Sequence, residues 1–136
     1  MDLYAENILD HYRHPRNKGE ERSPTVTHKE ENASCGDDLV VDLVIEDGRV
    51  SNVLWRGQGC AISQAAISLL SEELKKKSTD EVMSIDTKAV RDLLGVPIGI
   101  RREKCAFLGL HAVKNAIRKA QNQDPQSWRE TIQIDK

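Results

Sequence analysis

The chain of 136 residues has the length of a single domain, and its 20 basic and 22 acidic residues nearly cancel, which argues against a nucleic-acid-binding or anionic-membrane-binding surface. Aromatic residues make up 4% of the chain, too few for a base-stacking surface, and no apolar run approaches the roughly 18 residues of a membrane span. Three cysteines cannot close a complete set of intrachain disulfides, and the first residues lack the basic and apolar segments of a signal peptide. We therefore expect residues 1–136 to form one domain of a reduced, cytoplasmic protein.

The first predicted element is an amphipathic helix of about three turns, because apolar residues recur at helical spacing near the start of the chain. Its apolar face consists of Tyr4, Ile8, Leu9 and Tyr12. Asp2 is placed to cap the start of this helix, and Pro15 is expected to end it.

Two strands are predicted next with the clearest pattern in the chain. Apolar and polar residues alternate over 39–46, the pair Asp47 and Gly48 suits a two-residue type I′ turn, and residues 50–56 return as the second strand. Residues 16–34 are polar and loop-rich, with one further strand expected near 25–29.

Helical spacing resumes after the second cysteine. The apolar positions of 62–74 predict a helix with Cys60 at its N-terminus and lysines at its C-terminal end. A short helix is expected over 86–94, closed by Gly95 and Pro97, and a longer one opens at Cys105 and continues to Ala120. The segment from residue 124 onward, with Trp128, is either a short docked segment or a loose tail.

The three cysteines carry the chemistry of the chain. Each stands beside glycine or lysine, and Asp37 follows Cys35 by two residues, so in an extended segment the two side chains project to the same side. Three thiolates and one carboxylate can form a tetrahedral zinc site or hold an iron-sulfur cluster. We therefore expect Cys35, Asp37, Cys60 and Cys105 to form one metal site in which the carboxylate is the weaker, replaceable donor.

The neighbours of these residues support the same interpretation. Cys60 and Cys105 open predicted helices, whose N-termini stabilise thiolates, and Lys104 places a cation beside Cys105. Both thiols are thus expected to be predisposed to the anionic form. Gly36 and Gly59 let the backbone come close to an ion or to a partner.

Spacing alone leaves other interpretations open. Free cysteines are common as small buried hydrophobes, and Asp37 taken alone is typical of a turn or cap. The four histidines share no spacing, and we expect none of them to be a ligand. His111, which lies one residue past the apolar stripe of its helix, is the histidine most able to approach the site.

The chain resembles the IscU/NifU-type iron-sulfur cluster assembly family. The matching segments are residues 4–17 (YAENILDHYRHPRN), 32–37 (NASCGD), 57–63 (GQGCAIS), 65–70 and 104–108 (KCAFL). The resemblance implies an α+β fold in which a three-stranded antiparallel sheet carries helices on one face and the site lies at one end. It also implies Cys35, Asp37, Cys60 and Cys105 as ligands of zinc or of a nascent cluster, and a cysteine desulfurase as sulfur donor.

Two features depart from the family's IscU branch, which usually has His before the last cysteine and a Leu-Pro-Pro-Val-Lys motif for a dedicated Hsp70-type chaperone. Here Lys104 precedes Cys105 and residues 96–100 read VPIGI, which argues against hand-off through that chaperone. The Lys-Cys pair resembles the SufU branch, whose members act as zinc-dependent sulfur acceptors. That branch carries an insertion between the second and third cysteines, whereas 45 positions separate them here, so the sequence is mixed between the branches.

The leading hypothesis is a cluster-assembly scaffold without enzymatic turnover. It accepts persulfide sulfur on Cys35, with Cys105 as second choice, builds a transient [2Fe-2S] cluster and passes it to apo iron-sulfur proteins. One alternative is a zinc-dependent sulfurtransferase that uses the same four residues, and another is a zinc-stabilised interaction domain. The sequence does not decide between zinc and iron as the bound metal, and it leaves the oligomeric state open, a homodimer included.

Overall fold

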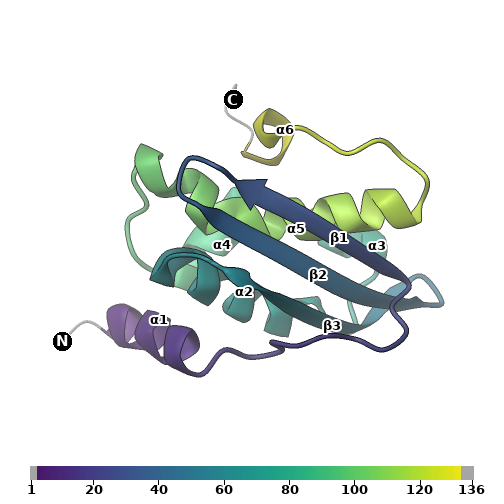
Figure 1. Ribbon diagram of the computed structural model, residues 1–136, viewed down its shortest axis with the longest axis horizontal. Helices are drawn as coiled ribbons and strands as arrows, with labels where there is room; N and C mark the ends of the chain where they lie inside the picture. The colour runs from purple at the N-terminus through teal and green to yellow at the C-terminus, as the bar shows by residue number, and fades with distance from the viewer. Residues whose placement is uncertain (1–2, 133–136) are drawn as a thin grey trace.

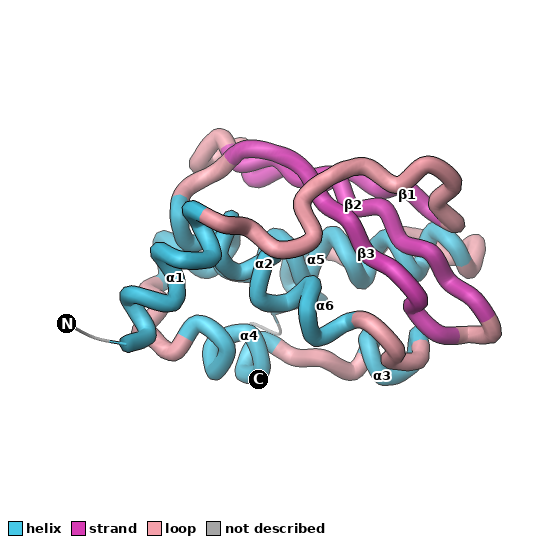
Figure 2. Tube along the Cα trace, turned by 90° about the horizontal axis from the view of Figure 1, so that it is seen from below, coloured by secondary structure: helices cyan, strands magenta, loops and turns pink. Residues whose placement is uncertain are grey.

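The computed structural model describes residues 3–132, which fold into a sheet with helices layered against one of its faces (Figures 1 and 2). The strands are β1 (Val26–Asn32), β2 (Asp37–Glu46) and β3 (Arg49–Gln58). The helices are α1 (Leu3–Arg13), α2 (Ala61–Leu74), α3 (Thr79–Met83), α4 (Thr87–Leu94), the 3-10 turn η1 (Ile100–Arg102), α5 (Glu103–Ala120) and α6 (Trp128–Ile132). This is the expected α+β architecture.

The sheet is antiparallel with the strand order β1-β2-β3. The β2–β3 hairpin turns at Asp47 and Gly48, whose φ angles of 53° and 72° are both positive, as a type I′ turn requires. The turn prediction is therefore confirmed. β1 is longer than the expected strand over 25–29 and continues to Asn32. There it pairs with Asp37, the first residue of β2, at the end of the sheet away from the β2–β3 turn.

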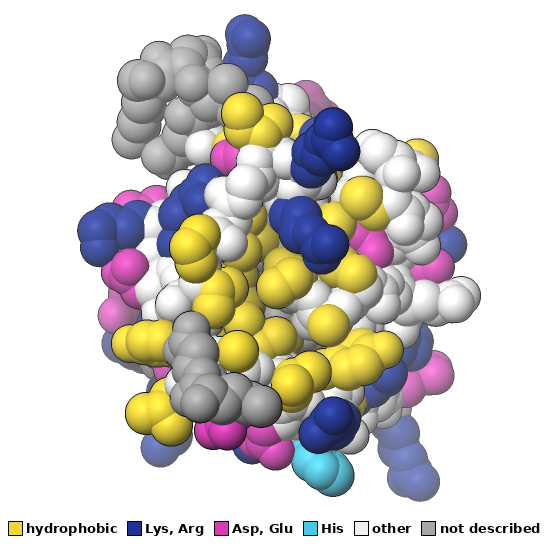
Figure 3. Space-filling view, turned by 90° about the vertical axis from the view of Figure 1, so that its left-hand side faces the viewer, with side chains coloured by type: hydrophobic (Ala, Val, Ile, Leu, Met, Phe, Trp, Pro, Cys, Tyr) yellow, Lys and Arg dark blue, Asp and Glu magenta, His cyan; other side chains and the backbone are white. Residues whose placement is uncertain are grey.

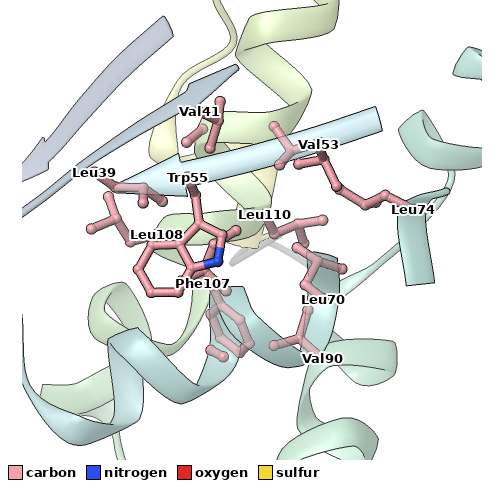
Figure 4. Close-up of a cluster of buried hydrophobic side chains, with 14 of the residues drawn as sticks. Leu39, Val41, Val53, Trp55, Leu70, Leu74, Val90, Phe107, Leu108 and Leu110 are labelled. Atoms are coloured by element: carbon pink, nitrogen blue, oxygen red, sulfur yellow. The ribbon is translucent and has the colours of Figure 1, made fainter. Parts of the chain in front are cut away.

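The core lies between the sheet and the helices α2 and α5. Val41 and Trp55 pair across β2 and β3, and both are fully buried against these helices (Figure 4). The Trp55 indole N–H donates to the Arg16 carbonyl, which holds the segment after α1 against the sheet. The predicted apolar stripes of the helices over 62–74 and 105–120 supply most of the helical side of this core, so both of those predictions are confirmed.

The first helix is correctly predicted, but its predicted apolar face is wrong. Tyr4, Leu9 and Tyr12 are exposed, and the buried side is formed by Ile8 and His11. His11 can be buried because its Nδ1 lies 2.7 Å from Ser68 Oγ on α2, which satisfies the ring nitrogen away from water. The proposed cap Asp2 lies outside the described residues.

Two short helices complete the fold. α3 has no counterpart among the predicted elements, although Ser78 and Glu81 form the capping box whose sequence signature is Ser-x-x-Glu. α6 settles the alternatives for the end of the chain in favour of a docked segment, because the Trp128 ring stacks on His111 of α5 with 4.1 Å between ring centroids. Among the described residues, no helix combines the length and apolar character that a membrane crossing demands.

Candidate metal centre

The end of the β1–β2 hairpin positions the first two candidate ligands. Asn32 pairs with Asp37, so the loop between them contains residues 33–36 and ends at Gly36, whose φ of 72° allows the chain to re-enter β2. The Cys35 N–H donates to the Asn32 carbonyl at 3.2 Å. This geometry leaves Cys35 exposed at the tip, while Asp37 points inward and is only 2% exposed.

Cys105 comes to the same place from the opposite end of the chain. It lies in the first turn of α5, which begins two residues earlier than expected, at Glu103. The sulfur atoms of Cys105 and Cys35 are 3.4 Å apart. Within residues 3–132, Cys35, Asp37 and Cys105 form a group whose potential ligand atoms all lie within 4.8 Å of one another. The structure thus brings three of the four expected ligands together.

Cys60 approaches this group with its backbone. It is the N-cap residue of α2, as expected, and its N–H donates to Asp37 Oδ1 at 3.2 Å. Its thiol is half-buried and is not part of the group of three ligand atoms found in the described part of the chain. Cys60 therefore anchors the carboxylate in this structure.

Gly59 makes the approach of α2 to Asp37 possible. A Cβ atom at this position would lie 2.7 Å from Asp37 Oδ1 and would overlap Ser63 Oγ. Real Cβ atoms do not come this close to other heavy atoms, so a side chain here would displace the Ser63 hydroxyl and the Asp37 carboxylate, or the start of α2 itself.

The expectation that Cys105 is predisposed to be anionic is wrong for the metal-free site. Burial first, and then the neighbouring Cys35 thiol and Asp37 carboxyl group, raise the pKa of the Cys105 thiol far above its ordinary value. The Lys104 ammonium group lies 5.7 Å from the centre of the Trp128 ring, where it makes a cation–π contact. Desolvation therefore outweighs the helix N-terminus at Cys105, and a bound cation would supply a positive charge that favours the thiolate.

Asn32 also belongs to this site, although it was not among the predicted site residues. This residue is 3% exposed, and its side-chain Nδ2 donates to Asp37 Oδ2 at 3.4 Å and to Cys105 Sγ at 3.8 Å. The spacing of the sequence contained a signal for this residue. Asn32 lies three residues before Cys35, and a four-residue hairpin loop over 33–36 places it opposite Asp37.

His111 belongs to a different network. Its Nδ1 lies 2.6 Å from Thr131 Oγ1, its Nε2 lies 3.7 Å from Glu30 Oε1, and its ring stacks on Trp128. Through these contacts His111 holds α6 against α5. No histidine belongs to the ligand group formed by the described residues.

A cleft of about 410 Å³ opens beside Cys35. Its lining residues are Asn32, Ser34, Cys35, Ile100, Arg101, Glu103, Lys104 and Ile132. Ile100 is 87% exposed at its rim. Figure 3 shows this end of the molecule, where apolar side chains gather at the centre and Lys and Arg side chains stand around them. The lining beside the exposed thiol is thus mixed, with two isoleucines, two basic side chains and one acidic side chain.

The donor set fits a soft or borderline metal ion. The 3.4 Å between the two sulfur atoms is close to the edge of about 3.8 Å expected for a tetrahedron with zinc–sulfur bonds of about 2.3 Å. Two thiols with one carboxylate exclude a site built for magnesium or calcium, which require a shell of oxygen ligands.

Comparison with known proteins finds a matching family model and similar proteins. The family model described as NifU-like N terminal domain matches residues 3–126. The iron-sulfur cluster assembly scaffold protein IscU of Thermotoga maritima is 29% identical over 136 residues, covering 86% of this chain and 94% of that protein. The zinc-dependent sulfurtransferase SufU of Bacillus subtilis is also 29% identical, over 134 residues, with coverages of 86% and 90%.

The fold is similar to solved structures as well. A putative iron-sulfur cluster assembly scaffold protein for the SUF system from Fervidobacterium islandicum superimposes with a TM-score of 0.72. Its sequence is 23% identical, and the match covers 82% of this chain and 94% of the other. At this identity the likeness supports the fold.

Proposed function

This chain belongs to the NifU-like N-terminal domain family, and on that basis we propose that it is a scaffold for iron-sulfur cluster assembly. The observation that carries the proposal is the meeting of exposed Cys35 with buried Asp37 and Cys105 at one open end of the fold. The Thermotoga maritima relative is named as such a scaffold. In this proposal the chain receives sulfur from a cysteine desulfurase, builds a [2Fe-2S] cluster as its cargo and releases it to apo iron-sulfur proteins.

Cys35 is the proposed sulfur acceptor because it is the exposed cysteine beside the cleft. Its thiolate attacks the outer sulfur of the desulfurase persulfide. A new S–S bond forms on Cys35, the bond to the desulfurase cysteine breaks, and that cysteine leaves as a thiolate. An external low-potential electron donor then supplies the two electrons that convert each transferred sulfur to sulfide.

The proposed ligands of the cargo are Cys35, Asp37, Cys60 and Cys105. Cys60 is included because its backbone N–H donates to Asp37 Oδ1, which supports a place for this residue at the edge of the group. Asp37 is the proposed leaving ligand, since a carboxylate oxygen is a harder donor than a thiolate and binds a soft centre less strongly. One weak ligand among strong ones suits a site that releases what it holds.

A zinc-dependent sulfurtransferase is the second candidate, favoured by Lys104 directly before Cys105 and by the similarity to the Bacillus subtilis SufU. The same four residues would hold the zinc, which would keep their thiols deprotonated at neutral pH. Cys35 would remain the residue that meets the persulfide, because it is the exposed cysteine. A zinc-stabilised interaction domain would use the same ligands without sulfur transfer.

Anaerobic reconstitution distinguishes the three functions. The protein is incubated with ferrous iron, cysteine, a reductant and a cysteine desulfurase, and the visible spectrum is followed before apo-ferredoxin is added. A stoichiometric [2Fe-2S] chromophore that moves to the ferredoxin supports the scaffold. Retained zinc with persulfide on the protein and faster desulfurase turnover supports the sulfurtransferase, and zinc binding without either supports the interaction domain.

A further inference from the structure

We infer that Asn32 is a positioning residue of the metal centre, whose side-chain amide holds the Asp37 carboxylate and the Cys105 sulfur in place. The inference rests on the proposed function in treating Asp37 and Cys105 as ligands. Its basis is that a single buried amide contacts both donor atoms from the neighbouring strand.

The sheet register delivers Asn32 to this position. Asn32 is the last residue of β1 and pairs with Asp37, the first residue of β2, and both side chains are buried on the inner side. A buried amide needs partners for its two N–H groups and its oxygen. The two N–H groups find Asp37 Oδ2 and Cys105 Sγ, so the donors are directed at the site.

The orientation of the amide is fixed from its other side. The Ser34 hydroxyl donates to Asn32 Oδ1 at 3.2 Å, so the oxygen faces the loop and the nitrogen faces the ligands. The reversed amide would bring its oxygen toward the Asp37 carboxylate, which accepts hydrogen bonds and does not donate them. Asn32 also accepts the Cys35 N–H on its backbone carbonyl, so it contacts three of the four proposed ligand residues.

Two donors from different elements thereby hold Asp37. Cys60 N–H bonds Oδ1 from the start of α2, and Asn32 Nδ2 bonds Oδ2 from β1. Hydrogen bonds of this kind orient a ligating carboxylate, and removing one typically costs about 10–100-fold in metal affinity. The bond to Cys105 draws electron density from the sulfur, which lowers its donation to a bound metal.

The test uses Co²⁺ as the sole added metal and compares wild type with Asn32→Ala, which removes the amide. We expect the variant to bind Co²⁺ at least about tenfold more weakly in a chelator competition. We also expect its sulfur-to-cobalt charge-transfer band to move to lower energy, because the Cys105 thiolate loses an N–H···S hydrogen bond. A residue that only stabilised the hairpin would leave the energy of this band unchanged.

Glu31→Ala is the matched control, because Glu31 precedes Asn32 on β1, is exposed and pairs with Asp38 on the outer side of the sheet. It should leave both the affinity and the band as in wild type. If Asn32→Ala fails to fold, Ser34→Ala tests the same idea, since it removes only the hydroxyl that orients the amide. Ser34→Ala should shift the affinity and the band in the same direction by a smaller amount.

The inference and the proposed function fail in different ways. Wild-type affinity and an unshifted band in folded Asn32→Ala would overturn the positioning role and leave the scaffold function standing. If wild type bound no Co²⁺, the proposed site would fail, and NMR of the metal-free protein would decide the inference. In that measurement the Asn32 side-chain NH₂ signals must shift in Cys105→Ser and in Asp37→Ala; unmoved signals in both variants would overturn the contacts.

Discussion

The sulfur atom of Cys35 lies 3.4 Å from the sulfur atom of Cys105, although 70 positions separate the two residues in sequence. The two thiols are chemically unequal, because Cys35 is exposed at a loop tip and Cys105 is 3% exposed in the first turn of α5. The Cys35 thiol can therefore contact a partner protein, whereas the buried Cys105 thiol can act only as a ligand inside the metal centre.

Alkylation should separate the two thiols in the metal-free protein. At pH 8 we expect iodoacetamide to modify Cys35 at least about tenfold faster than Cys105, because burial raises the Cys105 pKa and the thiolate is the nucleophile. Mass spectrometry of peptides at timed intervals measures both rates. Equal rates would show that Cys105 is neither shielded nor held protonated.

Persulfide transfer should follow the same order. With a cysteine desulfurase and cysteine, Cys35→Ser should lose nearly all persulfide on the protein, whereas Cys105→Ser should retain it. The reason is that an attacking thiol must reach the donor sulfur, and Cys35 is the exposed one. Persulfide found on Cys105 in the Cys35→Ser variant at the wild-type rate would assign the acceptor role to Cys105.

The metal content of single Cys→Ser variants should show which cysteines are ligands. Cys35→Ser, Cys60→Ser and Cys105→Ser should each sharply reduce bound zinc or reconstituted cluster, because a hydroxyl replaces a soft thiolate donor. Elemental analysis after anaerobic purification measures this loss, with circular dichroism to show that each variant is folded. Cys60→Ser is the decisive variant, since its backbone contacts Asp37 while its sulfur lies outside the ligand group of the described residues. Unchanged metal content would limit Cys60 to anchoring Asp37.

Asp37 should control release. Asp37→Ala should still assemble a cluster on the cysteines with an external ligand in the vacant position, but should transfer it to apo-ferredoxin more slowly than wild type. Asp37→Cys should hold the cluster more tightly still, because it completes the four-thiolate set of permanent [2Fe-2S] proteins. Transfer rates followed by visible circular dichroism test this, and wild-type transfer and retention in Asp37→Ala would make Asp37 a structural residue only.

Gly59→Ala should damage both stability and the site. Its Cβ would overlap Ser63 Oγ and lie 2.7 Å from Asp37 Oδ1, an overpacking that typically costs about 1–3 kcal/mol. Urea unfolding and Co²⁺ affinity measure the two effects. Gly99→Ala is the matched control, because a Cβ there meets nothing within 4 Å and should leave both quantities unchanged. A neutral Gly59→Ala would mean that the start of α2 can move without affecting Asp37.

Stability should fall in mild acid through two buried histidines. Burial lowers the pKa of His111 and of His11 below the ordinary 6.5, although Glu30 and Glu72 respectively oppose the shift. Above pH 6.5 both rings are neutral in folded and unfolded protein, so their contribution is constant. Below pH 6.5 the unfolded chain takes up protons that the folded chain excludes, and the free energy of unfolding decreases.

Urea unfolding of the metal-free protein between pH 8 and 5.5 measures this slope. His111→Gln should show a shallower slope than wild type, because one of the two groups no longer titrates. Glu30, His28 and Lys104 also act on His111, so the same series in Glu30→Gln should steepen the slope by removing the carboxylate that favours the charged ring. An unchanged slope in both variants would exclude His111 as a source of the pH dependence.

Local patterns are enough to predict most of the secondary structure. The type I′ turn at Asp47 and Gly48, the helix over Ala61–Leu74 and its start after Cys60 depend on side-chain periodicity and on backbone preferences of neighbouring residues. The same patterns, together with the family resemblance, are enough to identify Cys35, Asp37 and Cys105 as candidate ligands. The turn and the helix are local features that depend on neighbouring residues, whereas the ligand set also requires the family resemblance.

Other features are decided only where distant segments pack together. α1 buries His11 in place of Tyr4 because Ser68 of α2 offers its ring a hydrogen-bond partner, which no spacing within α1 reveals. The Cys105 pKa is raised although the residue lies in the first turn of a helix, because burial and then the neighbouring Cys35 and Asp37, which come from the β1–β2 loop and the start of β2, disfavour the thiolate. Asn32 becomes part of the site only through strand register. Burial and desolvation depend on which surfaces meet, and that information lies in the fold as a whole.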